Sequence, residues 1–211
     1  ATSLADVKRF HKDFYGSNSM QITVVGDFDK AQTTKVLDEI TANWQSANSY
    51  KRVDTPYQKL SNKAMDFNTP DKENATFVAS MSVPVGQNHA DAPALTIGNY
   101  MLGGGFLNSR LATRLRQKDG LSYGAGSFIR ISDFDERAAW GAYAICAPQN
   151  LAKVEVGFKE EIARLLKDGF TDEEVVAAKS GLLQGRKVSR SQDRELAGTL
   201  NSNLLLDRSM Q

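Results

Sequence analysis

Apolar residues recur every three or four positions through much of the chain, the spacing that places side chains on one face of an α-helix. On this basis helices are predicted over about residues 4–14, 30–44, 90–102, 107–118, 151–168, 172–182 and 191–206. Two of them carry start signals, since Ser3 with Asp6 and Thr171 with Glu174 have the spacing of a capping box. Gly169 follows the longest helix and is suited to cap its C-terminal end.

Other segments alternate apolar and polar residues or concentrate β-branched and aromatic ones, which predicts β-strands. The predicted strands cover residues 20–26, 63–68, 75–85, 121–132 and 137–147. The last two flank the acidic stretch DFDE, so we expect an antiparallel hairpin there. The whole pattern predicts an α+β fold, with a mostly antiparallel sheet and helices packed on one face.

A polar stretch, residues 47–62, shows no hydrophobic period and contains a proline, and we interpret it as a linker. It follows a helix–strand–helix piece, residues 1–46, and precedes the larger part of the chain, residues 63–211. We therefore predict two structural parts of unequal size.

The composition narrows the possible partners. Of the 211 residues 41% are hydrophobic and 24% are charged, as in ordinary globular proteins. The formal net charge of +1 disfavours nucleic acid as a partner. Apolar runs are only a few residues long, so no segment is predicted to span a membrane. The chain begins without an initiator Met and without a signal-peptide pattern, and we expect it to be a fragment.

Histidine and cysteine, which commonly bind zinc, are scarce in this chain. The single cysteine, Cys146, excludes an internal disulfide and a cysteine-based zinc site, and its alternating apolar surroundings predict a buried thiol. His11 and His89 have no His or Glu at metal-ligand helical spacing, so we expect no metal site in this chain. The P-loop pattern, G-x-x-x-x-G-K-S/T, is also absent from the sequence.

One stretch, LGGGFLNSRLATRLRQKDGLSYG at residues 102–124, joins a glycine loop to an arginine-rich helix. The three glycines of its loop, residues 103–105, either break a helix in a tight turn or form a loop whose bare backbone approaches an extended ligand. Its three arginines either form a solvated helical face or belong to a binding site. Local patterns leave both pairs of alternatives open.

The same stretch closely resembles the non-catalytic half of insulinase/pitrilysin-family zinc metallopeptidases. In that half a small glycine loop precedes S-R-L and then L-R-x-K-x-G-L-x-Y, which this chain matches at residues 109–111 and 115–123. DGFTDEEVVAAKSGL and FHKDFYGSNSMQITVVGDFD resemble further parts of the family, so the resemblance covers nearly the whole chain. It implies a metallohydrolase repeat of the mitochondrial-processing-peptidase type.

Members of this family hold zinc in one repeat, through His-x-x-Glu-His and a distal Glu, whereas the other repeat is degenerate. Because this chain lacks that motif, the resemblance implies the inactive repeat, with zinc expected only in the catalytic half of the full-length protein. It assigns Arg116 and Tyr123 an assisting role in a composite site, where such donors stabilise negative charge on the peptide carbonyl oxygen. The residues that we expect at the bound peptide are Gly103, Gly104, Gly105 and Arg110.

The resemblance also implies that residues 1–46 are the end of a preceding repeat and that the repeat from residue 63 is truncated at its C-terminus. We expect the fragment alone to be inactive, with a catalytic repeat and a peptide substrate as partners. We predict that strand 20–26 completes the sheet of the next repeat, in its own chain or in a dimer, because an unpaired apolar strand exposes an edge. The family resemblance suggests that the protein is located in the periplasm. A structural subunit or a peptide-binding module without protease activity is the alternative function.

Overall fold

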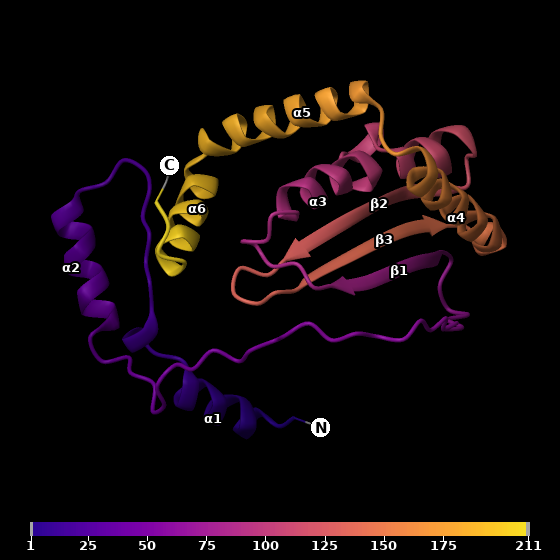
Figure 1. Cartoon of the computed structure of the whole chain (residues 1–211). Helices are drawn as coiled ribbons and strands as arrows, with labels where there is room; N and C mark the ends of the chain where they lie inside the picture. The colour runs from indigo at the N-terminus through magenta and orange to yellow at the C-terminus, as the bar shows by residue number, and fades with distance from the viewer. Residues whose placement is uncertain (1, 210–211) are drawn as a thin grey trace. The chain divides into compact units, whose positions relative to one another are not determined.

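The computed structural model describes residues 2–209 and divides into two compact units (Figure 1). One unit combines the residues up to Val53 with those from Gly185 onward, and the other comprises Asp54–Gln184. The C-terminal helix therefore belongs with the N-terminal residues, whereas the sheet and the arginine-rich helix lie in the larger unit.

The larger unit is built on an antiparallel sheet of β1 (Ala75–Val83), β2 (Ser122–Ile131) and β3 (Ala138–Cys146). The strand order is β1-β3-β2, so the predicted hairpin is formed and β3 lies in the centre. The strand predicted at residues 63–68 is wrong, because the structure assigns these residues to no strand. All six of them are exposed, so no buried face selects a strand conformation.

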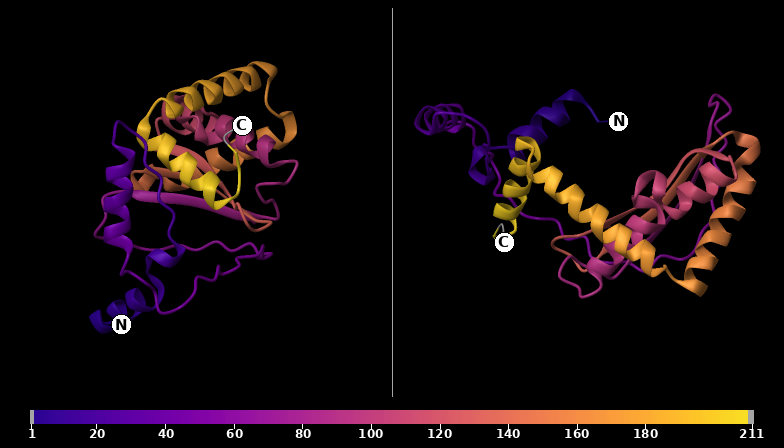
Figure 2. Two further views of the ribbon diagram at one scale, coloured as in Figure 1. Left: turned by 90° about the vertical axis from the view of Figure 1, so that its left-hand side faces the viewer. Right: turned by 90° about the horizontal axis from the view of Figure 1, so that it is seen from above.

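The helices of the larger unit pack on one face of this sheet, as predicted. They are α3 (Ala92–Asn99), its π-helical continuation η2 (Tyr100–Gly104), the short η3 (Phe106–Asn108), the π-helical η4 (Ala112–Lys118), the short η5 (Pro148–Asn150), α4 (Leu151–Asp168) and the first part of α5 (Asp172–Arg190). Figures 1 and 2 show α3 and α4 against the same side of the sheet. The arrangement is the α+β fold that the sequence predicts.

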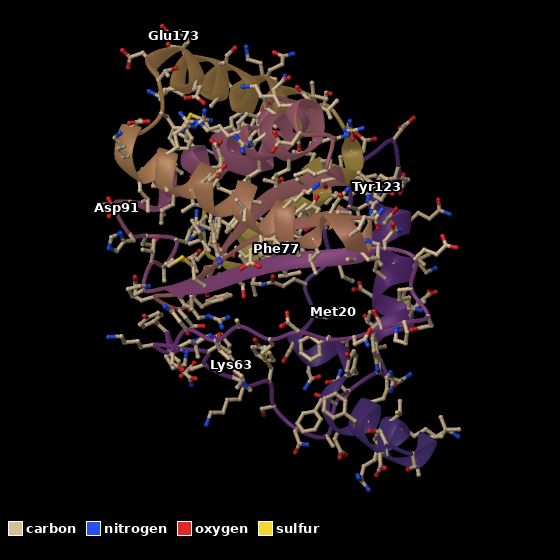
Figure 3. The ribbon with its side chains drawn as sticks, turned by 90° about the vertical axis from the view of Figure 1, so that its right-hand side faces the viewer. Met20, Lys63, Phe77, Asp91, Tyr123 and Glu173 are labelled. Atoms are coloured by element: carbon tan, nitrogen blue, oxygen red, sulfur yellow. The ribbon has the colours of Figure 1, made fainter. Side chains whose placement is uncertain are left out.

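The core of the larger unit lies between the central strand and the helices. Three small residues of β3 face the helices, Ala142, Ala144 and Cys146, and all three are fully buried. Small side chains on the strand let Leu115 of η4 and Val154 of α4 pack closely against the sheet. Phe77 of β1, labelled in Figure 3, contacts Phe158 of α4 with ring centroids 5.1 Å apart. The buried thiol predicted for Cys146 is confirmed.

The smaller unit contains α1 (Leu4–Phe14), the short η1 (Ser17–Ser19), α2 (Lys30–Thr41) and α6 (Asp193–Leu205). The predicted capping box of α1 is present, with the Asp6 amide donating to Ser3 Oγ and the Ser3 amide donating to the Asp6 carboxylate. None of the described residues in this unit is buried. The apolar face of α1 is correspondingly open to solvent.

The strand predicted at residues 20–26 is not formed in this structure. The two predicted helices on either side of it are present, but the intervening residues pair with no strand among the described residues. Ile22 and Val24 remain 44% and 42% exposed. A strand needs a neighbour for its backbone hydrogen bonds, and the described part of this unit offers none.

Candidate functional site

The turn between η4 and β2 lies between Arg116 and Tyr123, for which the family resemblance implies a catalytic role. Arg116 lies in the last turn of η4, and Gly120 reverses the chain with a φ of 63°, a left-handed value that glycine adopts without strain. The amide of Asp119 donates to the Arg114 carbonyl at 3.1 Å, and the amide of Leu121 donates to the Leu115 carbonyl at 2.9 Å. These hydrogen bonds fix the geometry of the turn.

Both assigned side chains are exposed at this turn. Tyr123 is 65% exposed and lies at the end of the sheet where β2 begins, as Figure 3 shows. Arg116 is exposed as well. Within residues 2–209 neither side chain has a hydrogen bond or ion pair, so their donors are open to a ligand. The structure thus places the two residues on either side of one turn, as their spacing suggested.

The glycine loop packs against the sheet rather than standing free of it. Gly103 is buried, and a Cβ atom at this position would overlap the backbone nitrogen and the side chain of Ser127 on β2. Gly104 is exposed, whereas Gly105 is half-buried. Close backbone packing accounts for the missing side chain at Gly103. A contact of the loop with substrate stays a prediction, for which Gly104 offers the exposed backbone.

Arg110 is held inside the larger unit by the start of α5. Its Nε and Nη2 atoms each donate to Glu174 at 2.6 Å, and Nη2 also donates to the Gly169 carbonyl at 2.8 Å. Its guanidinium lies 4.7 Å from the ring centroid of Phe170. The hydrogen bond from Arg110 lowers the pKa of the Glu174 carboxyl below its ordinary value. The structure does not place Arg110 with Arg116 and Tyr123, and its predicted contact with substrate remains untested.

A cavity of about 500 Å³ lies beside Arg110. Four basic residues line it, but Arg114 pairs with Asp119 and Glu160, and Arg164 pairs with Glu161. Most of the positive charge at this cavity is therefore neutralised within the chain.

Two π-helical segments occur in this region, and the sequence patterns did not predict them: η2 ends within the glycine loop, at Gly104, and η4 follows that loop. In η2 the amide of Gly105 donates to the Tyr100 carbonyl at 2.7 Å, and η4 ends with the equivalent bond from Asp119 to Arg114. π-Helical turns are rare and are frequent at functional sites. No residue type marks a π-helical turn in a single sequence, because it differs from an α-helical turn only in which backbone carbonyl accepts the amide hydrogen bond.

Metal and membrane features were sought in the described residues. No group of three or more His, Cys, Asp or Glu side chains in residues 2–209 is placed to hold a metal ion. The residues of this part of the chain therefore do not fit zinc, and we assign them no metal chemistry. None of the described helices is both long and apolar enough to cross a membrane.

Comparison with known proteins identifies a matching family. The sequence profile of a family described as the Peptidase M16 inactive domain matches residues 1–182. An uncharacterized zinc protease of Mycobacterium leprae is 27% identical over 190 residues, which are 88% of this chain and 41% of that protein. These matches confirm the family resemblance of the sequence.

Solved structures show the same fold. A peptidase M16 inactive domain from Pseudomonas fluorescens matches with a TM-score of 0.67 at 19% identity, covering 96% of this chain and 47% of that one. A protease from Helicobacter pylori matches with a TM-score of 0.72 at 20% identity, covering 98% and 50%. The chain spans about half or less of the length of these proteins.

Proposed function

The chain belongs to the family of peptidase M16 inactive domains, and from this premise we propose that it is the non-catalytic half of a zinc metalloendopeptidase. It places Arg116 and Tyr123 against a peptide in a composite site, whose zinc is held by a catalytic half of the same or a partner chain. The observation that carries the proposal is that these two exposed side chains flank a fixed turn and have no partner within residues 2–209.

The chemistry of the two side chains suits peptide hydrolysis. Attack on the scissile carbonyl leaves negative charge on its oxygen, and a donor aimed at that oxygen stabilises the transition state. The phenol of Tyr123 can donate one such hydrogen bond, and the guanidinium of Arg116 can donate two in a fork. Zinc, when bound in the catalytic half, polarises the same carbonyl. Removing one donor of this kind costs about 10²–10³-fold in kcat.

The exposed apolar residues of the smaller unit support the proposal that the chain works together with a catalytic half. Its described residues bury no apolar core, and Leu4 and Phe10 on α1 are 70% and 56% exposed. Apolar area of this kind stabilises a structure only when it is covered. The catalytic half is the partner that we propose to cover it, because the relatives of this chain are about twice its length or longer.

The test compares this chain alone with a protein in which it is joined to its catalytic half. We expect zinc and peptide cleavage only in the joined protein. Tyr123→Phe and Arg116→Ala should each lower kcat about 10²-fold or more while the zinc content stays unchanged. Tyr143→Phe removes a phenol that is 42% exposed on β3, and Arg130→Ala removes an arginine from the far end of β2, so both serve as controls.

Three outcomes would contradict the proposal. Stoichiometric zinc or peptide turnover in this chain alone would reveal a site that lies outside the one described. Full activity of both variants in the joined protein would exclude the composite site. Peptide affinity of the chain alone, without a catalytic partner, would indicate a peptide-binding module instead.

A further inference from the structure

The first residues of β2 form a β-bulge. Ser122 is opposite Cys146 and Gly124 is opposite Ile145, so Tyr123 is an extra residue between two successive partners on β3. A bulge changes the direction of a side chain relative to regular alternation, and bulges are common beside active sites. The 65% exposure of Tyr123, next to the buried Ser122, follows from this local geometry.

The Ser122 hydroxyl links the backbone on both sides of the bulge. Its Oγ lies 2.7 Å from the Gly124 carbonyl oxygen and 2.8 Å from the Ile145 carbonyl oxygen, to which it can donate in turn. It also accepts a hydrogen bond from the Gly124 amide at 3.2 Å. Ser122 is only 7% exposed, and its hydroxyl satisfies backbone groups that water scarcely reaches.

We propose that Ser122 is a positioning residue, which holds the bulge and thereby sets the direction of the Tyr123 side chain. The inference rests on the proposed function, in which Tyr123 touches the substrate. Without the hydroxyl, the Gly124 amide loses its acceptor and the strand can relax toward regular pairing. A one-residue change of register turns a side chain to the opposite face of a sheet, so Tyr123 would point away from the site.

Ser127 provides a matched comparison on the same strand. It is also 7% exposed, but its Oγ bonds the side-chain oxygen of Asn99 at 2.8 Å and lies outside the bulge. Ser127→Ala therefore removes a similar buried hydroxyl without touching the backbone around Tyr123. A general loss of stability would appear in both alanine variants, whereas a loss of Tyr123 positioning would appear only in Ser122→Ala.

The first experiment measures amide hydrogen exchange in the full chain and needs no catalytic half. Ser122→Ala should speed exchange at the Gly124 amide by about fivefold or more, since the amide loses its hydrogen bond. Ser127→Ala should leave the Gly124 rate unchanged. Equal Gly124 rates in the wild type and in Ser122→Ala would overturn the proposed support of the bulge.

The second experiment is a double-mutant cycle on kcat in the protein joined to its catalytic half. Ser122→Ala should lower kcat about tenfold or more when Tyr123 is present and have almost no effect in the Tyr123→Phe background. Ser127→Ala should change kcat by the same factor in both backgrounds. If Ser122→Ala also acts equally in both, the positioning role is wrong while the proposed function stands. If Tyr123→Phe itself has no effect, the proposed function fails instead.

Discussion

The ion pair between Arg110 and Glu174 is expected to be a main support of the larger unit. The guanidinium makes two hydrogen bonds of 2.6 Å to the carboxylate and one of 2.8 Å to the Gly169 carbonyl. The side chain of Arg110 is 12% exposed and that of Glu174 is 31% exposed. The arginine also lies 4.0 Å from Glu161, which is 3% exposed. Arg110→Ala therefore removes the neighbouring positive charge from the carboxylates of Glu174 and Glu161.

The size of the effect follows from these exposures. Removing one partner of a buried ion pair costs about 3–5 kcal/mol. Water can reach part of the Glu174 carboxylate, and Arg164 remains 2.6 Å from Glu161. We therefore expect Arg110→Ala to lower the free energy of unfolding by about 2–3 kcal/mol. Arg114→Ala is the matched control, because Arg114 is 38% exposed and its ion pairs should contribute only about 0–1 kcal/mol.

Within the full chain, urea unfolding of the larger unit can be followed separately by the fluorescence of one tryptophan. The chain has two tryptophans, and Trp140 packs against the core of this unit, so a Trp44→Phe background leaves Trp140 as the fluorescent reporter. The urea midpoint of Arg110→Ala should fall by about 1–2 M relative to that background. A midpoint equal to that of Arg114→Ala would refute the reasoning. It would show that the guanidinium is not needed for folding and is available to a substrate.

Three further predictions concern single side chains of the larger unit. The pKa of Glu174 is lowered in the folded chain, so Glu174→Gln should reduce the free energy of unfolding by a constant amount above about pH 5. This difference from the wild type should disappear as the pH falls through the folded-state pKa, which urea unfolding at each pH can measure. Gly103→Ala should destabilise the unit by about 1–3 kcal/mol through overlap with Ser127, whereas Gly124→Ala, which meets open space, should cost less than about 1 kcal/mol in the same assay. Burial raises the pKa of the Cys146 thiol, so a thiol reagent should label the native chain only at the rate of unfolding.

The sequence was a good guide wherever short-range periodicity decides the structure. The strands 75–83, 122–131 and 138–146 and the long helix 151–168 lie where the hydrophobic pattern predicts them. Core-facing side chains recur every second residue in a strand and every three or four residues in a helix, so the hydrophobic pattern of the sequence follows directly from the backbone geometry. Capping boxes were equally predictable, because both partners of each box lie within one turn of helix.

Residues 20–26 show where such a pattern is insufficient. Their apolar, β-branched character marks a strand, but a strand forms only against a neighbour that supplies hydrogen bonds. The described residues of the smaller unit provide no such neighbour, and the segment stays exposed. The strand propensity of a segment therefore shows what conformation it is suited to, whereas a strand forms only where a partner strand is present.

The arginines of η4 and the residues just before it illustrate the same limit at the candidate site. Arg110, Arg114 and Arg116 lie within seven residues of one another, and local sequence does not distinguish them. Their roles differ because of partners that lie far along the chain. Arg110 bonds a glutamate 64 residues away, and Arg114 pairs with one 46 residues away. Arg116 is left as the arginine of this group without a partner within residues 2–209. The unpaired state of Arg116 beside two paired arginines supports the proposed binding role, and only the tertiary structure reveals it.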